Sequence, residues 1–226
     1  MALFRDRVDA GQRLAAKLAA YAGRPGVIVL GLPRGGVPVA EQVALALGAD
    51  LDAFVVRKIG VPGQEELAMG AVATGGVSVV NQEVVDRLAI SDEMLQRAAQ
   101  EEMREVEARE REYRDERRPL DLGGKLVILV DDGLATGASM HAAVEAARMH
   151  GAARVIVAVP VAPPSSCEEL RAIADAVICA TTPERFSSVG EWYDDFSQIT
   201  DDEVREALAR HRRPEEWLEP AAPVIS

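Results

Sequence analysis

The segment Val127–Ser139, with the sequence VILVDDGLATGAS, constrains the fold more than any other part of the chain. Its apolar run favours a buried strand, and two acids, Asp131 and Asp132, follow directly. A turn rich in glycine and hydroxyl groups then opens a helix, and the backbone N–H groups of such a turn attract anions. Because the two carboxylates can accept hydrogen bonds from vicinal hydroxyls, the segment predicts a site for a ribose together with its 5′-phosphate.

Other apolar runs alternate with helical patterns along the chain. We expect strands at 27–32, 51–56, 125–130, 153–162 and 175–181, and helices at 4–22, 37–47, 91–118, 139–150 and 168–174. Two shorter strands, 69–74 and 77–80, are expected to form a hairpin through Gly75-Gly76, and 57–66 is expected to be a loop. This order of elements predicts an α/β fold with a central parallel sheet of about five strands and helices on both faces.

We interpret residues 1–226 as a single domain with two additions. Residues 82–118, dense in glutamate and arginine, form a predicted helical insertion, for which a coiled-coil dimer arm is the alternative. Residues 183–226, which hold most of the aromatic side chains, form a predicted C-terminal hood and tail.

Charge and hydropathy exclude several classes of protein. The 25 lysines and arginines against 37 aspartates and glutamates give a net charge of −12, which argues against a non-specific nucleic-acid partner or an anionic membrane surface. No apolar run approaches the roughly 18 residues that cross a bilayer, and the N-terminus lacks the apolar core of a signal peptide. The two cysteines form no disulfide framework. We expect a cytoplasmic protein with neither nucleic-acid nor membrane partners, and a homodimer.

The segment Val127–Ser139 resembles the motif that binds 5-phosphoribosyl-1-pyrophosphate (PRPP) in type I phosphoribosyltransferases. The resemblance implies the type I phosphoribosyltransferase fold, with a C-terminal hood over the site. It also implies that Asp131 and Asp132 contact the ribose. The 5′-phosphate would be held by the loop residues Gly133, Ala135, Thr136, Gly137, Ala138 and Ser139.

Two further segments are similar to other parts of that family. GLPRGGVPVA, at Gly31–Ala40, resembles the pyrophosphate loop, with Arg34, Gly35 and Gly36 as ligands; a plain strand-to-helix turn is the alternative. Related enzymes have a non-proline cis peptide bond in this loop, and Arg34-Gly35 is its expected place. FVVRKIGVPG, at Phe54–Gly63, resembles a strand end at which an Arg-Lys pair reaches the pyrophosphate.

In that second segment Arg57 and Lys58 would be the catalytic cations, and Ile59–Leu67 the mobile loop that closes over the site. An ordinary solvated strand end is the alternative for this pair.

The chain as a whole, including SSVGEWYDDF near the C-terminus, resembles a bacterial branch usually called predicted phosphoribosyltransferases. The implied activity is Mg²⁺-dependent transfer of 5-phosphoribosyl between PRPP and a nitrogenous base, with release of pyrophosphate. The Mg²⁺ would arrive with PRPP and meet Asp131 and Asp132 only indirectly. A non-catalytic PRPP-sensing regulator of the same fold, or an accessory competence-type homologue, is the alternative.

The acceptor base is the part of the function that the residues specify least. Phe186, Trp192 and Tyr193 form a possible hood that stacks a base, and simple packing of a C-terminal flap is the alternative. Family members that use hypoxanthine, guanine or xanthine typically have an aspartate where this chain has Ala135. Because alanine cannot transfer a proton, we rank adenine-like or non-purine acceptors above 6-oxopurines.

Overall fold

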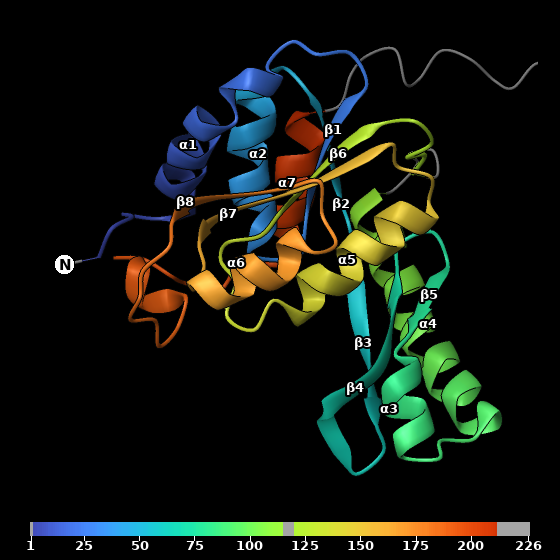
Figure 1. Cartoon of the computed structure of the whole chain (residues 1–226). Helices are drawn as coiled ribbons and strands as arrows, with labels where there is room; N and C mark the ends of the chain where they lie inside the picture. Colours follow the sequence, from blue (N-terminus) through green and yellow to red (C-terminus); the bar gives the residue numbers. More distant parts are fainter. Residues whose placement is uncertain (1, 115–119, 212–226) are drawn as a thin grey trace, which may run out of the picture.

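The structure is a computed structural model that describes residues 2–114 and 120–211 (Figure 1). Its centre is a parallel sheet of five strands in the order β2-β1-β6-β7-β8. The strands are β1 (Val27–Gly31), β2 (Asp50–Ala53), β6 (Leu126–Val130), β7 (Arg154–Val161) and β8 (Ala176–Thr181). The sequence therefore predicted the α/β class and the five-stranded sheet correctly.

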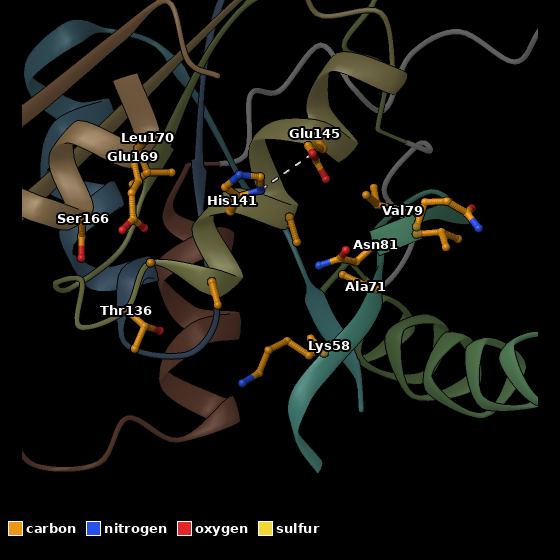
Figure 2. A pocket seen from close by; sticks show the side chains of 17 residues that line it. Lys58, Ala71, Val79, Asn81, Thr136, His141, Glu145, Ser166, Glu169 and Leu170 are labelled. Carbon is orange, nitrogen blue, oxygen red and sulfur yellow. Dashed lines mark ion pairs between the residues drawn. The ribbon is translucent and has the colours of Figure 1, made fainter. Parts of the chain in front are cut away.

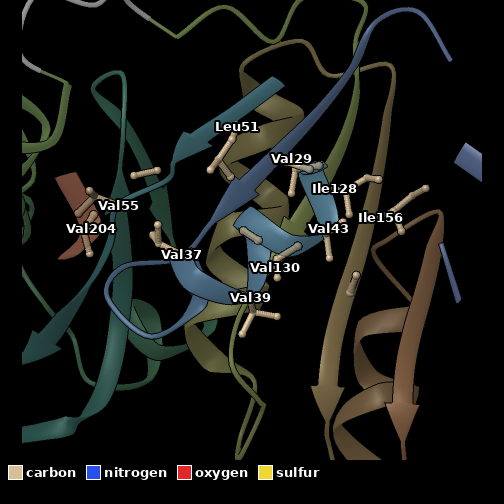
Figure 3. Close-up of a cluster of buried hydrophobic side chains, with 14 of the residues drawn as sticks. Val29, Val37, Val39, Val43, Leu51, Val55, Ile128, Val130, Ile156 and Val204 are labelled. Atoms are coloured by element: carbon tan, nitrogen blue, oxygen red, sulfur yellow. The ribbon is translucent and has the colours of Figure 1, made fainter. Parts of the chain in front are cut away.

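Helices cover both faces of this sheet, as Figure 1 shows. On one face lie α1 (Arg7–Lys17), α2 (Gly36–Leu47) and α7 (Asp201–Arg210); on the other lie α5 (Ala138–Met149) and α6 (Pro164–Arg171). Successive residues of β6 alternate between the two cores: Ile128 and Val130 pack toward α2 (Figure 3), while Val127 and Leu129 pack toward α5. A strand that is buried on both sides accounts for its unbroken apolar sequence.

A second, antiparallel sheet carries the part of the chain that differs most from expectation. It consists of β3 (Val56–Val61), β4 (Gln64–Ala73) and β5 (Val77–Val80), in that order. The prediction of a loop at 57–66 was wrong, because these residues form the β3–β4 hairpin. Ile59 and Val61 are buried on one side of β3, while Lys58 is exposed and Gly60 is half-buried, so the strand has the alternation of a half-buried edge.

The helical insertion packs on this second sheet. It holds α3 (Gln82–Arg87) and α4 (Asp92–Arg114), and α4 contacts β3, β4 and α7. The helix predicted at 91–118 therefore exists, although residues 115–119 lie outside the described residues. None of the helices in the described ranges is both long enough and apolar enough to span a membrane.

Some helices begin or end at residues other than those predicted, because local capping outweighs the hydrophobic periodicity. The first helix was predicted at 4–22, but it begins at Arg7 because the Asp6 side chain accepts the Asp9 N–H at 2.8 Å. It ends at Lys17, and a 3₁₀ turn, η1 (Ala19–Tyr21), follows. Helix α6 begins at Pro164, four residues before its predicted start, with proline in the first turn where no N–H is needed. A second 3₁₀ turn, η2 (Gly190–Trp192), lies in the C-terminal segment.

Strand order places the candidate loops together. The chain runs outward from β1 to β2 and then returns to the other side of β1 with β6, so the order reverses between β1 and β6. Open α/β sheets bind ligands at such a reversal, beyond the carboxyl ends of the strands. The loop after β1 and the loop after β6 both begin at that edge.

Candidate functional site

The two acids at the end of β6 lie directly against the glycine loop that follows β1. The Leu32 N–H donates to the Val130 carbonyl at 2.8 Å. A Cβ atom on Gly36 would lie 2.6 Å from that same carbonyl oxygen, and one on Gly35 would overlap the Asp132 carboxylate. Only glycine permits this approach, so the structure brings the predicted pyrophosphate loop and the acid pair into contact.

Asp132 is held by a buried arginine that the sequence analysis missed. The Arg7 Nε atom donates to Asp132 Oδ2 at 2.8 Å, and the two side chains are 9% and 15% exposed. Another nitrogen of Arg7 donates to the Ser197 carbonyl at 2.8 Å, and its guanidinium carbon lies 4.1 Å from the Phe196 ring centre. Because 125 residues separate Arg7 from Asp132, no local sequence signal indicates the pair.

Burial changes the protonation of both acids. It raises the pKa of Asp131 well above its usual value, and the adjacent charge of Asp132 raises that pKa further. Burial also raises the pKa of Asp132, although Arg7 opposes the shift. The Asp132 N–H donates to Asp131 Oδ1 at 2.8 Å and favours the charged form of that acid. The pair therefore takes up a proton more readily than two solvated carboxyl groups would. A cationic ligand would offset the repulsion between the two carboxylates.

The loop between Asp132 and α5 has the conformation of an anion-binding turn. Gly137 has a φ of +72° and occupies the N-cap of α5, where it supplies no side chain to the N–H groups of the first turn. Those N–H groups therefore stay available to an anion. Gly133 lies so close to Val189 that a Cβ atom would come within 2.5 Å of that side chain.

Helix α6 fixes the outer part of this loop. The Ser166 hydroxyl donates to the Ala135 carbonyl at 2.7 Å, and the Leu134 N–H donates to the Val161 carbonyl at 2.9 Å. The sequence analysis did not single out Ser166, because a serine in a helix near a proline has no distinguishing pattern.

A cavity of ≈ 520 Å³ opens beside the loop (Figure 2). One wall is the second sheet, from which Lys58 points toward the loop that carries Thr136. The opposite wall consists of α5 and α6, and His141 and Glu145 of α5 form an ion pair of 3.8 Å there when the histidine is protonated. Polar groups on this cavity include those of Lys58, Asn81, Thr136, His141, Glu145, Ser166 and Glu169.

The cationic side chains predicted for the pyrophosphate site lie in different surroundings. Lys58 lines the cavity, whereas Arg57 Nε lies 2.6 Å from Glu102 Oε2 on α4. Arg34 lies 3.5 Å from Asp201 of α7. The cis peptide bond expected at Arg34-Gly35 is instead one residue earlier, between Pro33 and Arg34.

The aromatic residues of the C-terminal segment pack beneath the acid pair. Tyr193 is 5% exposed, its ring contacts those of Phe4 and Phe196 at centroid distances of 5.3 and 5.0 Å, and its hydroxyl donates to the Asp132 carbonyl at 2.5 Å. Trp192 and Phe186 pack on the same small cluster. These contacts favour the packing alternative for Tyr193, because its ring already has two aromatic neighbours.

The residues offer a metal ion little direct coordination. In the described ranges no three His, Cys, Asp or Glu side chains come together as a metal-binding group. The acid pair supplies two carboxylates, of which Asp132 is engaged by Arg7. Such a pair fits a cation that brings most of its own oxygen ligands.

Comparisons with known proteins agree on one family. A family model described as "Phosphoribosyl transferase domain" matches residues 4–195. Two curated proteins of Mycobacterium tuberculosis, from strains CDC 1551 and H37Rv, are each named "Putative phosphoribosyl transferase" and are 45% identical over 213 residues. Those alignments cover 94% of this chain and 48% of each relative, so the chain spans about half the length of the curated relatives.

A solved structure is similar over almost its whole length. The crystal structure of the protein TT1426 from Thermus thermophilus is 43% identical and superposes with a TM-score of 0.83, covering 93% of this chain and 99% of that one.

Proposed function

The chain belongs to the phosphoribosyl transferase family and has the type I fold of that family, and on this premise we propose that it transfers 5-phosphoribosyl between PRPP and a nitrogenous base, with release of pyrophosphate. The observation that carries the proposal is the contact of the glycine loop Arg34–Gly36 with the acid pair, beside an uncapped helix N-terminus. A pyrophosphate loop, a ribose-binding acid pair and a phosphate-binding turn are the three parts that PRPP requires.

Each part of PRPP has a proposed partner. The 5′-phosphate accepts hydrogen bonds from the N–H groups and hydroxyls of Thr136–Ser139, in the turn whose Gly137 has a positive φ. The ribose hydroxyls donate to Asp131 and Asp132. The pyrophosphate meets Arg34 and the N–H groups of Gly35 and Gly36 on the other side of the acid pair. Lys58 reaches in from the wall of the cavity.

Charge separation accounts for the catalytic roles. As the bond from ribose C1 to the pyrophosphate oxygen breaks, positive charge develops on the ribosyl group, as it does in glycoside chemistry. Asp131 and Asp132 stabilise that charge, and Arg34, Arg57 and Lys58 stabilise the negative charge on pyrophosphate. A ring nitrogen of the base forms the new bond to C1, pyrophosphate leaves with the electrons of the broken C1–O bond, and the proton of that nitrogen passes to water.

Magnesium is proposed to enter with PRPP, since the acid pair provides two carboxylates and no cage of three ligands occurs among the described residues. When bound, Mg²⁺ supplies further neutralisation of the pyrophosphate oxygens. Asp131 and Asp132 would contact it through water, and their raised pKa values fit a site that is more stable with an added positive charge.

Adenine-like or non-purine bases are the proposed acceptors. Ala135 is exposed on the loop, and its carbonyl is engaged by Ser166. Its methyl group cannot exchange a proton with a purine nitrogen. A competition assay with adenine, hypoxanthine, guanine, xanthine, uracil and orotate tests this ranking, and efficient use of hypoxanthine or guanine would contradict it.

The decisive experiment measures pyrophosphate release from PRPP and Mg²⁺ in the presence of each base. Base-dependent release that disappears in Asp131→Asn/Asp132→Asn supports the transferase. Tight PRPP binding without release in any base would favour the sensing alternative instead. The expected homodimer and cytoplasmic location remain predictions; light scattering during size-exclusion chromatography checks the first.

A further inference from the structure

Both arginines assigned to pyrophosphate are already paired with carboxylates from outside the central sheet. Arg57 Nε lies 2.6 Å from Glu102 Oε2 on α4, and an Arg34 nitrogen lies 3.5 Å from Asp201 Oδ2 on α7. Helices α4 and α7 pack on each other, so one helical unit supplies both carboxylates.

Asp201 is anchored in its place. The Tyr113 hydroxyl, near the end of α4, donates a short hydrogen bond to Asp201 Oδ1 and leaves Oδ2 to face Arg34. Val55, Val37 and Val204 share one buried cluster (Figure 3), which ties the start of β3, the pyrophosphate loop and α7 together. The segments that carry Arg57, Arg34 and Asp201 therefore share one hydrophobic core.

Both arginine–carboxylate pairs are partly exposed to solvent. The Arg57 and Glu102 side chains are 37% and 27% exposed, and those of Arg34 and Asp201 are 32% and 35% exposed. Water reaches both pairs, so each is weakly held compared with a buried pair. By contrast, the Arg7 and Asp132 side chains are only 9% and 15% exposed, so water has little access to that pair.

We propose that Glu102 and Asp201 are internal competitors of pyrophosphate: they occupy Arg57 and Arg34 in the empty site and give way when a diphosphate binds. This inference rests on the proposed function. Pyrophosphate carries more charge than one carboxylate and takes over both arginines, and the two acids return when it leaves. The exchange weakens pyrophosphate binding and so favours product release. Both acids act as positioning residues, since neither touches the reacting atoms.

The test is the dissociation constant of inorganic pyrophosphate with Mg²⁺, measured by calorimetry on the full chain. Glu102→Gln and Asp201→Asn keep the shape of each side chain and remove its charge. Each is expected to bind pyrophosphate about 2- to 5-fold more tightly, the upper part of the range for a partly exposed charge pair. The double variant should gain approximately the product of the two factors.

Glu112→Gln is the matched control. Glu112 also lies on α4 and pairs with Arg205 of α7 at 2.6 Å, but neither partner belongs to the pyrophosphate loop. Glu112→Gln changes the net charge by the same amount as either test variant, and pyrophosphate affinity should stay within about twofold. Circular dichroism confirms that each variant remains folded.

The outcomes separate the competitor role from the activity itself. Unchanged or weaker pyrophosphate binding in both Glu102→Gln and Asp201→Asn overturns the competitor role, and so does an equal gain in Glu112→Gln. If the unmodified chain still releases pyrophosphate from PRPP in those cases, the proposed function stands alone. If neither the unmodified chain nor any variant binds PRPP or pyrophosphate, both proposals fail.

Discussion

The Asp131 side chain is half-buried at the end of β6, beside the carboxyl group of Asp132, and its loss of solvation and the neighbouring charge both raise its pKa. The folded chain therefore holds this proton more tightly than the unfolded chain. Its contribution to stability is complete below the ordinary aspartate pKa of about 3.9. That contribution is lost as the pH rises through the raised pKa of the folded state.

Asp131→Asn should consequently increase the free energy of unfolding at pH 7, because the neutral amide removes the desolvated charge and its repulsion from Asp132. The same variant should lose PRPP affinity, because the ribose loses a charged acceptor. Urea denaturation between pH 4 and pH 8 measures the free energy of unfolding. The difference between the variant and the unmodified chain should increase with pH. A variant that is less stable than the unmodified chain at pH 7 would contradict this account.

Asp175→Asn is the control with the opposite sign. Burial would raise the pKa of Asp175, but the Val155 N–H, at 2.7 Å, and Arg148, at 2.9 Å, outweigh it and lower the pKa. Its charged form therefore stabilises the fold above the ordinary aspartate pKa. Neutralising it should destabilise the chain at pH 7.

Arg7 is expected to support the site through Asp132. Arg7→Met leaves the Asp132 carboxylate enclosed without its partner, which should cost about 3 kcal/mol of unfolding free energy. Arg7→Met/Asp132→Asn removes both charges and should recover much of that loss. Urea denaturation of the unmodified chain, Arg7→Met, Asp132→Asn and the double variant gives the coupling energy of the two side chains as a double-mutant cycle. Additive losses would show that the two side chains do not interact.

At the scale of elements, α6 is expected to tune the phosphate loop. Ser166→Ala removes the donor to the Ala135 carbonyl and should weaken binding of ribose 5-phosphate about 3- to 10-fold, the effect of one neutral hydrogen bond. Ser165→Ala, on the exposed side of the same helix, should leave affinity unchanged. Calorimetry with ribose 5-phosphate compares the two. Equal affinities would mean that α6 does not hold the loop.

The sheet strands and the candidate loops were predictable because their signals are local. An apolar run that ends in Asp131-Asp132, or in the glycines after β1, marks a buried strand and its turn without knowledge of a partner. The β3–β4 hairpin was missed because Arg57, Lys58 and Gln64 resemble loop residues until the facing strand is known. Its stability comes from pairing and from the burial of Ile59, neither of which the segment shows alone.

The site residues that were missed share one property, which is a distant partner. Arg7 meets Asp132, Ser166 meets the Ala135 carbonyl, and Asp201 meets Arg34. Tertiary packing creates each of these contacts. The motifs therefore indicate where a ligand is expected, whereas the groups that hold the motifs in place emerge only from the fold.

At the scale of the whole molecule, the proposed ligand spans two separately supported halves. The pyrophosphate side is built on β1, α2 and α7, and the 5′-phosphate side on β6, α5 and α6. Arg34→Ala should therefore weaken binding of pyrophosphate and PRPP much more than binding of ribose 5-phosphate, whereas Ser166→Ala should weaken binding of ribose 5-phosphate and PRPP more than binding of pyrophosphate. Calorimetric titration of both variants with the three ligands checks the division. A loss of ribose 5-phosphate in Arg34→Ala equal to that of pyrophosphate would refute it.

The opening residues of the chain form a clip with the segment that precedes α7. The Phe4 N–H donates to the Trp192 carbonyl at 2.9 Å, and the Asp194 N–H donates back to the Phe4 carbonyl at 2.9 Å. Helix α1 begins shortly afterwards, at Arg7. A chain trimmed to begin at residue 8 would keep the residues of every strand in both sheets. It would nevertheless lack the guanidinium that orients Asp132. Two complete sheets are therefore no guarantee of an intact pocket when residues 2–7 are removed.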